Sequence, residues 1–245
     1  MSEPHEQISV ERLRMAGCLV ISLLLFLVCL LPFLFFEFAS QALENLHLSR
    51  SAALLVLLGS LLGSAVNIPI ARFPLDEEVL VPMFGPISGL SILPRFQRLR
   101  QECVVAINVG GCLVPMMLAI WLLRFILPAG TGVVAVLLVG IMLNSAICYR
   151  LARPIPRLGI ALPGFVPAVV ALCATLVGLG NPDYANIRAP VAFVIGTTGP
   201  LLGADLLHWK DFKTIATGTI SIGGAGTWDG IVLSGLLASF LAGLS

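Results

Sequence analysis

Seven long apolar segments dominate this sequence, and each has about the length that a helix needs to cross a lipid bilayer. The composition agrees, because 58% of the 245 residues are hydrophobic and only 11% are charged, whereas about 25% of the residues in a soluble domain are charged. The sequence therefore predicts an all-α, polytopic transmembrane helix bundle that forms a single integral membrane domain over residues 1–245. Its seven predicted spans are 15–38, 51–71, 103–127, 131–149, 160–179, 189–208 and 228–244.

The distribution of basic residues predicts the orientation of these spans. Eleven of the fourteen Lys and Arg residues lie in four regions that seven spans would place on one side of the membrane. Basic loops stay on the cytoplasmic side, so we expect a cytoplasmic N-terminus and an external C-terminus. The four basic regions are the N-terminal segment 1–14 and the loops 72–102, 149–159 and 208–227.

Several kinds of partner and cofactor find no support in the sequence. The net charge of +1 provides no basic face for nucleic acid. No Cys-x-x-Cys pair occurs, and His208 has no second histidine or nearby cysteine, so we expect no metal site. The run Gly223-Gly224-Ala225-Gly226 is not followed by Lys and Ser or Thr, so it is not a phosphate-binding loop. No cofactor is expected.

Two glycine-rich apolar stretches are candidates for re-entrant loops. They are 217–227, which precedes the last predicted span, and 81–89, which lies within the large cytoplasmic loop 72–102. Non-helical backbone at membrane depth occurs only where protein or a watery cavity satisfies its hydrogen bonds. Either stretch could therefore line a site.

Two short patterns occur twice in the chain. Residues 59–65 resemble residues 199–205, and residues 107–111 resemble residues 220–224. Both pairs keep the chain order, which is consistent with a duplication of three helices joined by a linker helix, a 3+1+3 repeat. The spacing Gly-x-x-x-Gly in the first pair has a simpler explanation, because small residues on one helical face let two backbones approach closely.

Two aspartates are the strongest candidates for chemistry. Asp205 lies near the cytoplasmic end of the sixth predicted span, and Asp229 lies near the cytoplasmic start of the seventh. Charges inside a membrane are costly and need a reason. Two carboxylates at the same depth on antiparallel neighbours cannot both ionise when they are close, so together they could supply an acid and a base that activate water. Alternatively, each aspartate caps a helix, or Asp205 pairs with a nearby lysine.

Other residues could complete a site around this pair. Glycines near the two aspartates would leave room for a water molecule or an extended peptide, and His208 follows Asp205 by three residues on the same helical face. Asn67 and Asn108 lie at span ends, where they either hydrogen-bond between helices or contact a ligand. The glycines are Gly203, Gly224, Gly226 and Gly230.

The same stretches resemble a known family of membrane proteins. The blocks 67–70, 108–111, 159–164, 203–207 and 221–230 are similar to those of an uncharacterised family of bacterial and archaeal membrane proteins, a domain of unknown function, over roughly residues 55–240. This resemblance implies a multi-pass protein of the cell membrane, the inner membrane in a bacterium, surrounded by lipid. It implies no activity.

A second resemblance concerns the two aspartates. Asp205-Leu206-Leu207 and the segment 229–237 are similar to the regions around the two catalytic aspartates of presenilin-like intramembrane aspartyl proteases. The Gly-x-Gly-Asp motif of those proteases is incomplete before Asp229, and no Tyr precedes Asp205. Their Pro-Ala-Leu motif has only a reversed, upstream counterpart in residues 161–163. The resemblance implies catalytic roles for both aspartates.

Three functions remain open at this point. The first is an intramembrane aspartyl hydrolase that acts on a transmembrane peptide with Asp205 and Asp229. The second is a small-solute transporter with a polar site between two three-helix repeats, containing Asn67, Asn108 and both aspartates. The third is a membrane scaffold without chemistry. The sequence indicates neither the substrate nor the oligomeric state.

Overall fold

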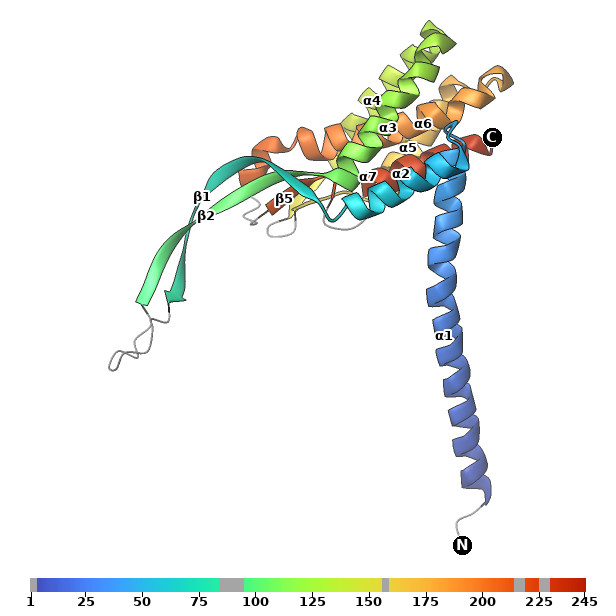
Figure 1. Ribbon diagram of the computed structural model, residues 1–245, viewed down its shortest axis with the longest axis vertical. Helices are drawn as coiled ribbons and strands as arrows, with labels where there is room; N and C mark the ends of the chain where they lie inside the picture. Colours follow the sequence, from blue (N-terminus) through green and yellow to red (C-terminus); the bar gives the residue numbers. More distant parts are fainter. Residues whose placement is uncertain (1–3, 84–94, 156–158, 214–218, 225–229) are drawn as a thin grey trace. The chain divides into compact units, whose positions relative to one another are not determined.

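The computed structural model describes residues 4–83, 95–155, 159–213, 219–224 and 230–245, and most of them lie in helices (Figure 1). The chain divides into two compact units, residues 1–41 and residues 42–245. The predicted helical fold class is confirmed, and each of the seven apolar segments contains one helix. The helices are α1 (Pro4–Glu44), α2 (Arg50–Gly63), α3 (Val114–Ile126), α4 (Thr131–Leu151), α5 (Val166–Gly178), α6 (Ala185–Pro200) and α7 (Gly230–Gly243).

Within the described residues, four helical stretches are long and apolar enough to cross a membrane. The remaining helices α2, α5 and α7 have 13 or 14 residues, and at 1.5 Å per residue each extends about 20 Å, less than the roughly 30 Å of a hydrocarbon core. The count of seven spans and their orientation stay predictions. The four stretches are Leu19–Glu44, Val109–Ala129, Thr131–Leu151 and Pro182–Leu206.

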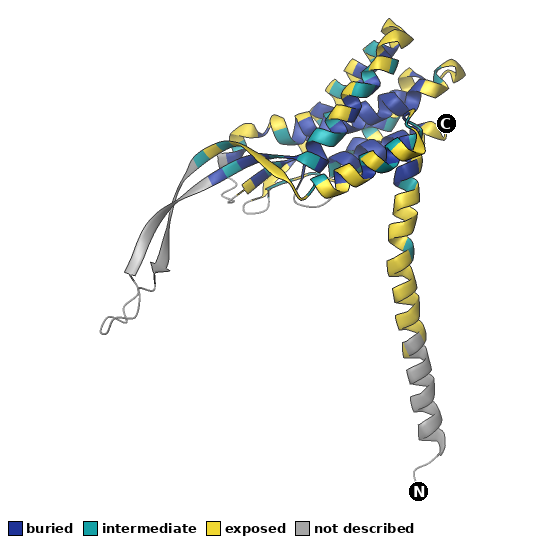
Figure 2. Ribbon diagram, viewed as in Figure 1, coloured by how far each residue is buried: buried dark blue, intermediate teal, exposed yellow. Residues whose placement is uncertain are grey.

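The first unit consists of most of α1. Its apolar side chains from Leu19 to Phe36 are largely exposed on every side of the helix (Figure 2). A helix that is apolar all round is stable only where an apolar medium or a partner covers it. This exposure is what a membrane-crossing helix requires.

The structure adds strands that the sequence analysis did not predict. Strands β1 (Asn67–Met83), β2 (Arg95–Asn108) and β5 (Thr219–Ile222) form one sheet in the order β1-β2-β5. Strands β1 and β2 are antiparallel, whereas β2 and β5 are parallel with Ile107 opposite Ile222. Short strands β3 (Arg153–Ile155) and β4 (Gly159–Ala161) form a second, antiparallel pair.

These strands correct the predicted ends of three spans. Residues 67–71, 103–108 and 160–161 were assigned to helices, but they belong to β1, β2 and β4. Helix α2 ends at Gly63, and Pro69 opposes a new helix here because proline disfavours the helical conformation at the residue before it. Prolines also interrupt the ladder of β1, where the register shifts after Pro69 and again after Pro74. Such breaks are tolerated because β1 is an edge strand.

Parts of the two candidate re-entrant stretches are described, and those parts lie in strands. Residues 81–83 of the stretch 81–89 belong to β1, and residues 219–222 of the stretch 217–227 form β5. The re-entrant arrangement itself stays a prediction. Residues 84–94, 217–218 and 225–227 lie outside the described residues. The backbone of β5 forms its ladder hydrogen bonds with β2. Protein therefore satisfies the non-helical backbone of this stretch, as the sequence requires of such backbone at membrane depth.

Helix α6 forms the centre of the second unit, and most of its residues are buried (Figure 2). It packs against α7 at Gly196, where an added Cβ would lie 3.0 Å from the Ser234 carbonyl oxygen. It packs against α4 at Gly199, where a Cβ would overlap the side chain of Asn144. Close packing of small residues is therefore confirmed for Gly199 and Gly203 against α4 and for Gly63 against Gly110, but a Cβ at Gly59 would meet nothing within 4 Å.

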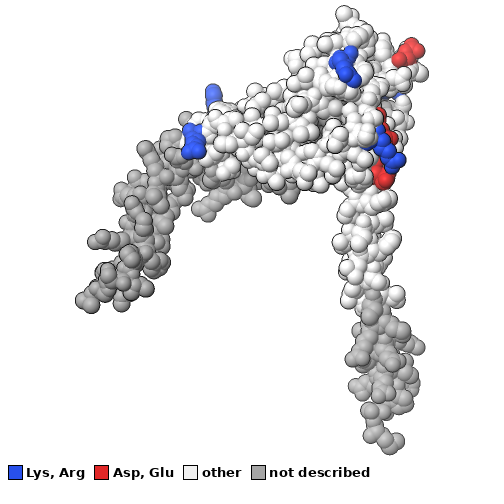
Figure 3. Space-filling view, viewed as in Figure 1, with Lys and Arg blue, Asp and Glu red and all other residues white. Residues whose placement is uncertain are grey.

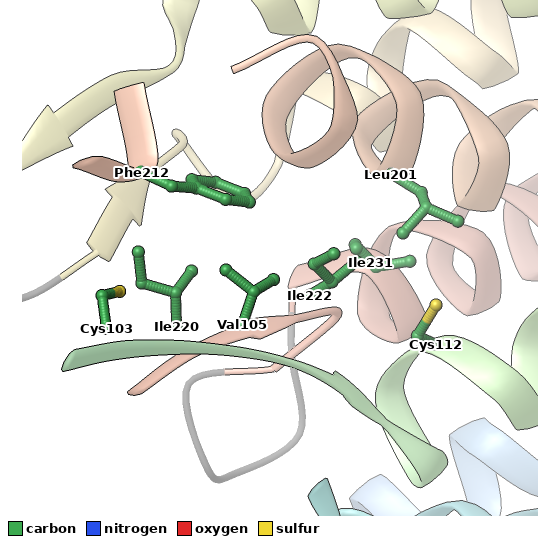
Figure 4. Close-up of a cluster of buried hydrophobic side chains, with 8 residues drawn as sticks. All are labelled: Cys103, Val105, Cys112, Leu201, Phe212, Ile220, Ile222 and Ile231. Atoms are coloured by element: carbon green, nitrogen blue, oxygen red, sulfur yellow. The ribbon is translucent and has the colours of Figure 1, made fainter. Parts of the chain in front are cut away.

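A buried apolar cluster joins the sheet to the helices. It contains side chains from β2, β5, α7 and the segment after α6, which point toward one another in Figure 4. Strands β2 and β5 therefore place alternate side chains in this cluster and present the others on the opposite face of the sheet. The members are Cys103, Val105, Cys112, Leu201, Phe212, Ile220, Ile222 and Ile231.

Charged side chains are sparse on the described surface of the second unit. On the face shown in Figure 3 they gather toward its two ends, and the area between them is almost entirely uncharged. Large apolar side chains such as Leu55, Met142 and Val177 are exposed, Val177 to 88%. An uncharged band flanked by charges matches the cross-section of a bilayer.

Candidate functional site

A cavity of about 620 Å³ lies where α6, α7, β4 and β5 meet. This volume is in the range of small-molecule and peptide sites, roughly 300–1,000 Å³. Its described lining contains one charged residue, Asp205, together with polar Asn67, Thr219 and Ser221. The rest is glycine, proline and apolar side chains: Gly159, Ile160, Ala161, Leu162, Gly164, Pro167, Pro200, Ala204, Phe212, Ile220, Gly224, Gly230 and Ile231.

Asp205 reaches this cavity because helix α6 changes its winding before it. Pro200 has no N–H, so the carbonyl of Gly196 lacks its usual helical donor. The hydroxyl of Ser234 on α7 donates to this carbonyl instead, at 2.5 Å. The chain then continues as a π-helical segment, η4 (Leu201–Leu206). Short π-helical segments are frequent at functional sites, and this one holds Asp205 half-buried at the cavity wall.

The carboxylate of Asp205 is held by the end of strand β5. Its Oδ2 accepts a hydrogen bond from the backbone N–H of Gly223 at 2.8 Å. Gly223 adopts a φ of 76°, a left-handed conformation that glycine takes without strain. The turn after β5 therefore points an N–H group at the carboxylate.

Close backbone contacts fix that turn against the segment that joins β2 to α3. A Cβ at Gly111 would overlap the carbonyl oxygen of Gly223, and a Cβ at Gly224 would lie 3.0 Å from Cγ of Asn108. Gly111 lies in a second π-helical segment, η1 (Val109–Leu113), which leads into α3. The strand end that holds Asp205 is thus packed directly on the start of α3.

The two predicted asparagines belong to one hydrogen-bond network. The buried Asn108 donates from Nδ2 to the carbonyl of Ser64 at 2.7 Å and to Oδ1 of Asn67 at 3.1 Å. Its Oδ1 accepts from the N–H of Gly111 at 2.7 Å. Ser221 on β5 donates to the same Oδ1 of Asn67 at 2.6 Å. Asn108 therefore orients Asn67, which lines the cavity.

The structure separates two predicted residues from the cavity. His208 is buried, and its Nδ1 lies 3.1 Å from the carbonyl oxygen of Gly203. Its ring contacts that of Tyr149 in a tilted arrangement, with the ring centroids 4.7 Å apart. A Cβ at Gly203 would overlap the carbonyl oxygen of Ser145 on α4. Both residues pack the end of α6 against α4, and neither belongs to the described lining.

Asp229 and Gly226 lie outside the described residues. Gly230, which follows Asp229 in the chain, borders the same cavity as Asp205. Helices α6 and α7 are antiparallel neighbours, since Gly196 contacts Ser234 and Gly235 while Pro200 and Ile231 line one cavity. Of the predicted residues, Asp205, Asn67, Gly224 and Gly230 come together here.

Two parts of the cavity wall, Ser221 and the segment of β4 and Leu162, were not predicted as site residues from the sequence. Ser221 belongs to a glycine-rich stretch that the sequence analysis singled out, and its place between two isoleucines gives the period of a strand. Strand β4 and Leu162 lie on another wall, and they include part of the reversed Pro-Ala-Leu sequence. This segment and Asp205 line the same cavity only because the chain folds that way, and the spacing of residues in the sequence does not indicate it.

The described residues contain no group of three or more His, Cys, Asp or Glu side chains that could hold a metal ion. The chemistry of the described wall is therefore that of one carboxylate, one amide, two hydroxyl groups and exposed backbone. A carboxylate that accepts a backbone N–H can still exchange a proton with water or with a second acid. Neutral amide and hydroxyl groups can orient a polar ligand beside it.

Comparison with known proteins places the chain in a family. Residues 61–241 match the family described as "Protein of unknown function (DUF1614)", and because the match covers most of the chain, the protein belongs to this family. The predicted resemblance to an uncharacterised membrane protein family, over roughly residues 55–240, is confirmed. No curated protein and no solved structure matches the chain.

Proposed function

We propose that this member of the DUF1614 family is an intramembrane hydrolase in which Asp205 and Asp229 activate water. The observation that supports it is the shared cavity: Asp205 lines its wall, and so does Gly230, the residue next to Asp229. Asp205 also lies in Pro182–Leu206, a helical stretch long and apolar enough to cross a membrane, and in low-dielectric surroundings two nearby carboxyl groups share a proton. The N-terminus is cytoplasmic in this proposal, as the basic residues predict.

The proposed reaction uses the two aspartates in complementary protonation states. The ionised carboxylate takes a proton from water as the water oxygen attacks the carbonyl carbon of a peptide bond. The protonated carboxyl group then gives its proton to the amide nitrogen as the C–N bond breaks. The products are a carboxyl group and an amine, and each aspartate ends in the state in which the other began.

Cleavage of a membrane-embedded peptide tests this proposal. The full chain in liposomes is given a fluorogenic transmembrane peptide of about 20 apolar residues. Asp205→Asn and Asp229→Asn should each lower the cleavage rate at least about a hundredfold, the usual contribution of a general acid or base. The matched control is Asp183→Asn, an identical change at an exposed carboxylate in the turn before α6. Absence of cleavage by the unaltered chain would overturn the proposal.

Thermal stability gives a second measure that does not need a substrate. If the two carboxyl groups repel each other, replacing one with Asn relieves the repulsion, and the hydrogen bond from Gly223 to residue 205 is kept by the amide oxygen. Each single variant should then match or exceed the melting temperature of the unaltered chain between pH 5 and 8, and the second substitution should add little. Additive losses of stability would instead show that each aspartate caps a helix.

A polar-solute transporter is the second candidate, and one observation favours it. Asn67 lines the same cavity as Asp205 and Ser221, as expected if asparagines and aspartates converge on a solute. Uptake of a panel of labelled amino acids and sugars into liposomes tests it. Uptake above that of protein-free liposomes, lost in both Asn67→Ala and Asp205→Asn, would support transport in place of hydrolysis. A negative result in both assays would favour the scaffold role.

A further inference from the structure

Two strand edges border the cavity beside Asp205. In the order β1-β2-β5, strand β5 is the last strand of its sheet, and β4 pairs only with β3 among the described strands. Each therefore has one side that no described strand covers. Such an edge presents backbone N–H and C=O groups that can pair with another extended chain.

The lining residues show that the cavity meets these strands at their edges. Three consecutive residues of β5, Thr219, Ile220 and Ser221, line it, and so do all three residues of β4, Gly159, Ile160 and Ala161. Consecutive side chains of a strand point to opposite faces of the sheet. A cavity bordered by consecutive residues therefore runs along the edge of the strand and does not lie on one face.

From this geometry we propose that the cavity binds an extended peptide segment, which pairs its main chain with the edge of β5. The proposal rests on the proposed hydrolase function and names its substrate class: a stretch of peptide unwound into a strand. The hydrogen bond from Gly223 to Asp205 lies directly after β5. A peptide paired with β5 would therefore pass beside the carboxylate.

The two faces of β5 indicate which residue types the bound peptide should contain. On one face, Ile220 points into the apolar cluster with Phe212 and Ile231 (Figure 4). On the other face, Ser221 and Asn67 form a polar pair. A peptide added beside β5 continues both faces of the sheet. It should therefore alternate apolar residues with small polar residues over about four positions, the length of β5.

The electrostatics of the described lining favour this occupant over a small anion. Asp205 is its one charged residue, and the rest is neutral and apolar. An acidic ligand would face this carboxylate without a described basic partner in the lining. The neutral backbone of a peptide supplies both donors and acceptors for a strand edge.

The test uses the full chain in detergent and a fluorescein-labelled hexapeptide, Thr-Val-Thr-Val-Thr-Val. Two matched peptides carry N-methyl groups on alternate peptide nitrogens, one on the odd and one on the even positions. Methylation removes main-chain donors and blocks strand pairing, but leaves the side chains in place. We expect the unmethylated peptide to bind, by fluorescence anisotropy, and at least one methylated peptide to bind at least tenfold more weakly. Equal binding of all three, or no binding, would overturn the proposal.

A pair of glycine variants locates the bound peptide. Gly164 lines the cavity, and a Cβ added there meets nothing within 4 Å, so Gly164→Phe should fill the space without a clash and weaken peptide binding at least tenfold. The control is Gly59→Phe on α2, where an added Cβ also meets nothing within 4 Å; its binding should be unchanged. Equal binding by both variants would place the peptide elsewhere and overturn the proposal.

Peptide binding and peptide cleavage, both measured on the unaltered chain, separate this proposal from the proposed function. If the unaltered chain binds the peptide but cleaves no substrate, the hydrolase proposal fails and the peptide site stands. If it cleaves a substrate but does not distinguish the methylated peptides, the peptide site fails and the hydrolase proposal stands.

Discussion

Two regions of the molecule use similar runs of small residues, but only one of them places a charge at a cavity. In the first, helix α2 meets Gly110, where the hydroxyl of Ser60 donates to the Gly110 carbonyl at 2.7 Å. In the second, the segment after α6 meets Gly223, whose N–H donates to Asp205 at 2.8 Å. Gly110 and Gly223 have the same position in the two similar stretches 107–111 and 220–224. The strands that precede them, β2 and β5, lie side by side and parallel.

Two sequence differences explain why only the second region places a carboxylate at the cavity. When residues 59–65 are aligned with 199–205, Ser60 corresponds to Pro200 and Ala65 corresponds to Asp205. The serine keeps a regular helix and adds a hydrogen bond, whereas the proline removes one and is followed by a π-helical segment. Similar sequences thus form a closed junction in one region and place a carboxylate at a cavity in the other. The 3+1+3 duplication itself stays a prediction.

The largest expected effect comes from filling the junction of the first region. A Cβ at Gly110 would overlap the carbonyl oxygen of Ser60 and the backbone nitrogen of Ser64, and backbone atoms cannot turn aside. Gly110→Ala should therefore lower the free energy of unfolding by roughly 3 kcal/mol or leave little folded protein. Gly223→Ala should be comparably severe, because its left-handed φ and its contact with Cys112 both oppose a side chain. The measurement is the folded yield and melting temperature in detergent. A native melting temperature for either variant would refute the close contact.

A smaller effect distinguishes the two corresponding glycines of the Gly-x-x-x-Gly patterns. A Cβ at Gly199 would overlap the Asn144 side chain, whereas a Cβ at Gly59 meets nothing within 4 Å. Gly199→Ala should lower the free energy of unfolding by about 2 kcal/mol. Gly59→Ala should raise it by about 0.5–1 kcal/mol, since alanine favours a helix interior. Chemical denaturation in mixed micelles compares the two, and equal effects would show that both glycines have the same role.

The smallest expected loss of stability comes from removing the serine hydroxyl groups that hydrogen-bond to the backbone in these two regions. Ser60→Ala removes one hydrogen bond between α2 and the start of α3 and should cost about 0.6 kcal/mol, a typical value between membrane helices. Ser234→Ala should cost more, about 1–2 kcal/mol, because Pro200 leaves the Gly196 carbonyl without its helical donor. Both variants are compared with the unaltered chain by their unfolding midpoints. The prediction fails if Ser60→Ala is the more damaging of the two.

The limits of prediction from this sequence are clearest in the strands. Residues 103–108 are apolar and lie next to a helix, so their hydrophobicity fits the start of a span as well as a buried strand. Their assignment to β2 depends on pairing with β1 and β5, and β5 is more than a hundred residues away in the chain. The candidate site is equally hard to predict from the sequence, because it also depends on long-range contacts. Asp205 stands out in an apolar segment, but the hydrogen bond that joins Asn67 to Ser221 spans 154 positions.

The amino-acid sequence alone is enough to locate most of each helix and to identify the family. Both follow from local properties: long apolar runs make helices that can cross a membrane, and short blocks of residues identify the family. Three other features arise from the folded chain: β2 and β5 pair in parallel, α6 continues as a π-helical segment that contains Asp205, and two strands border one cavity. These features depend on contacts between residues far apart in the chain, because a glycine such as Gly111 shows its role only when the Gly223 carbonyl lies against it.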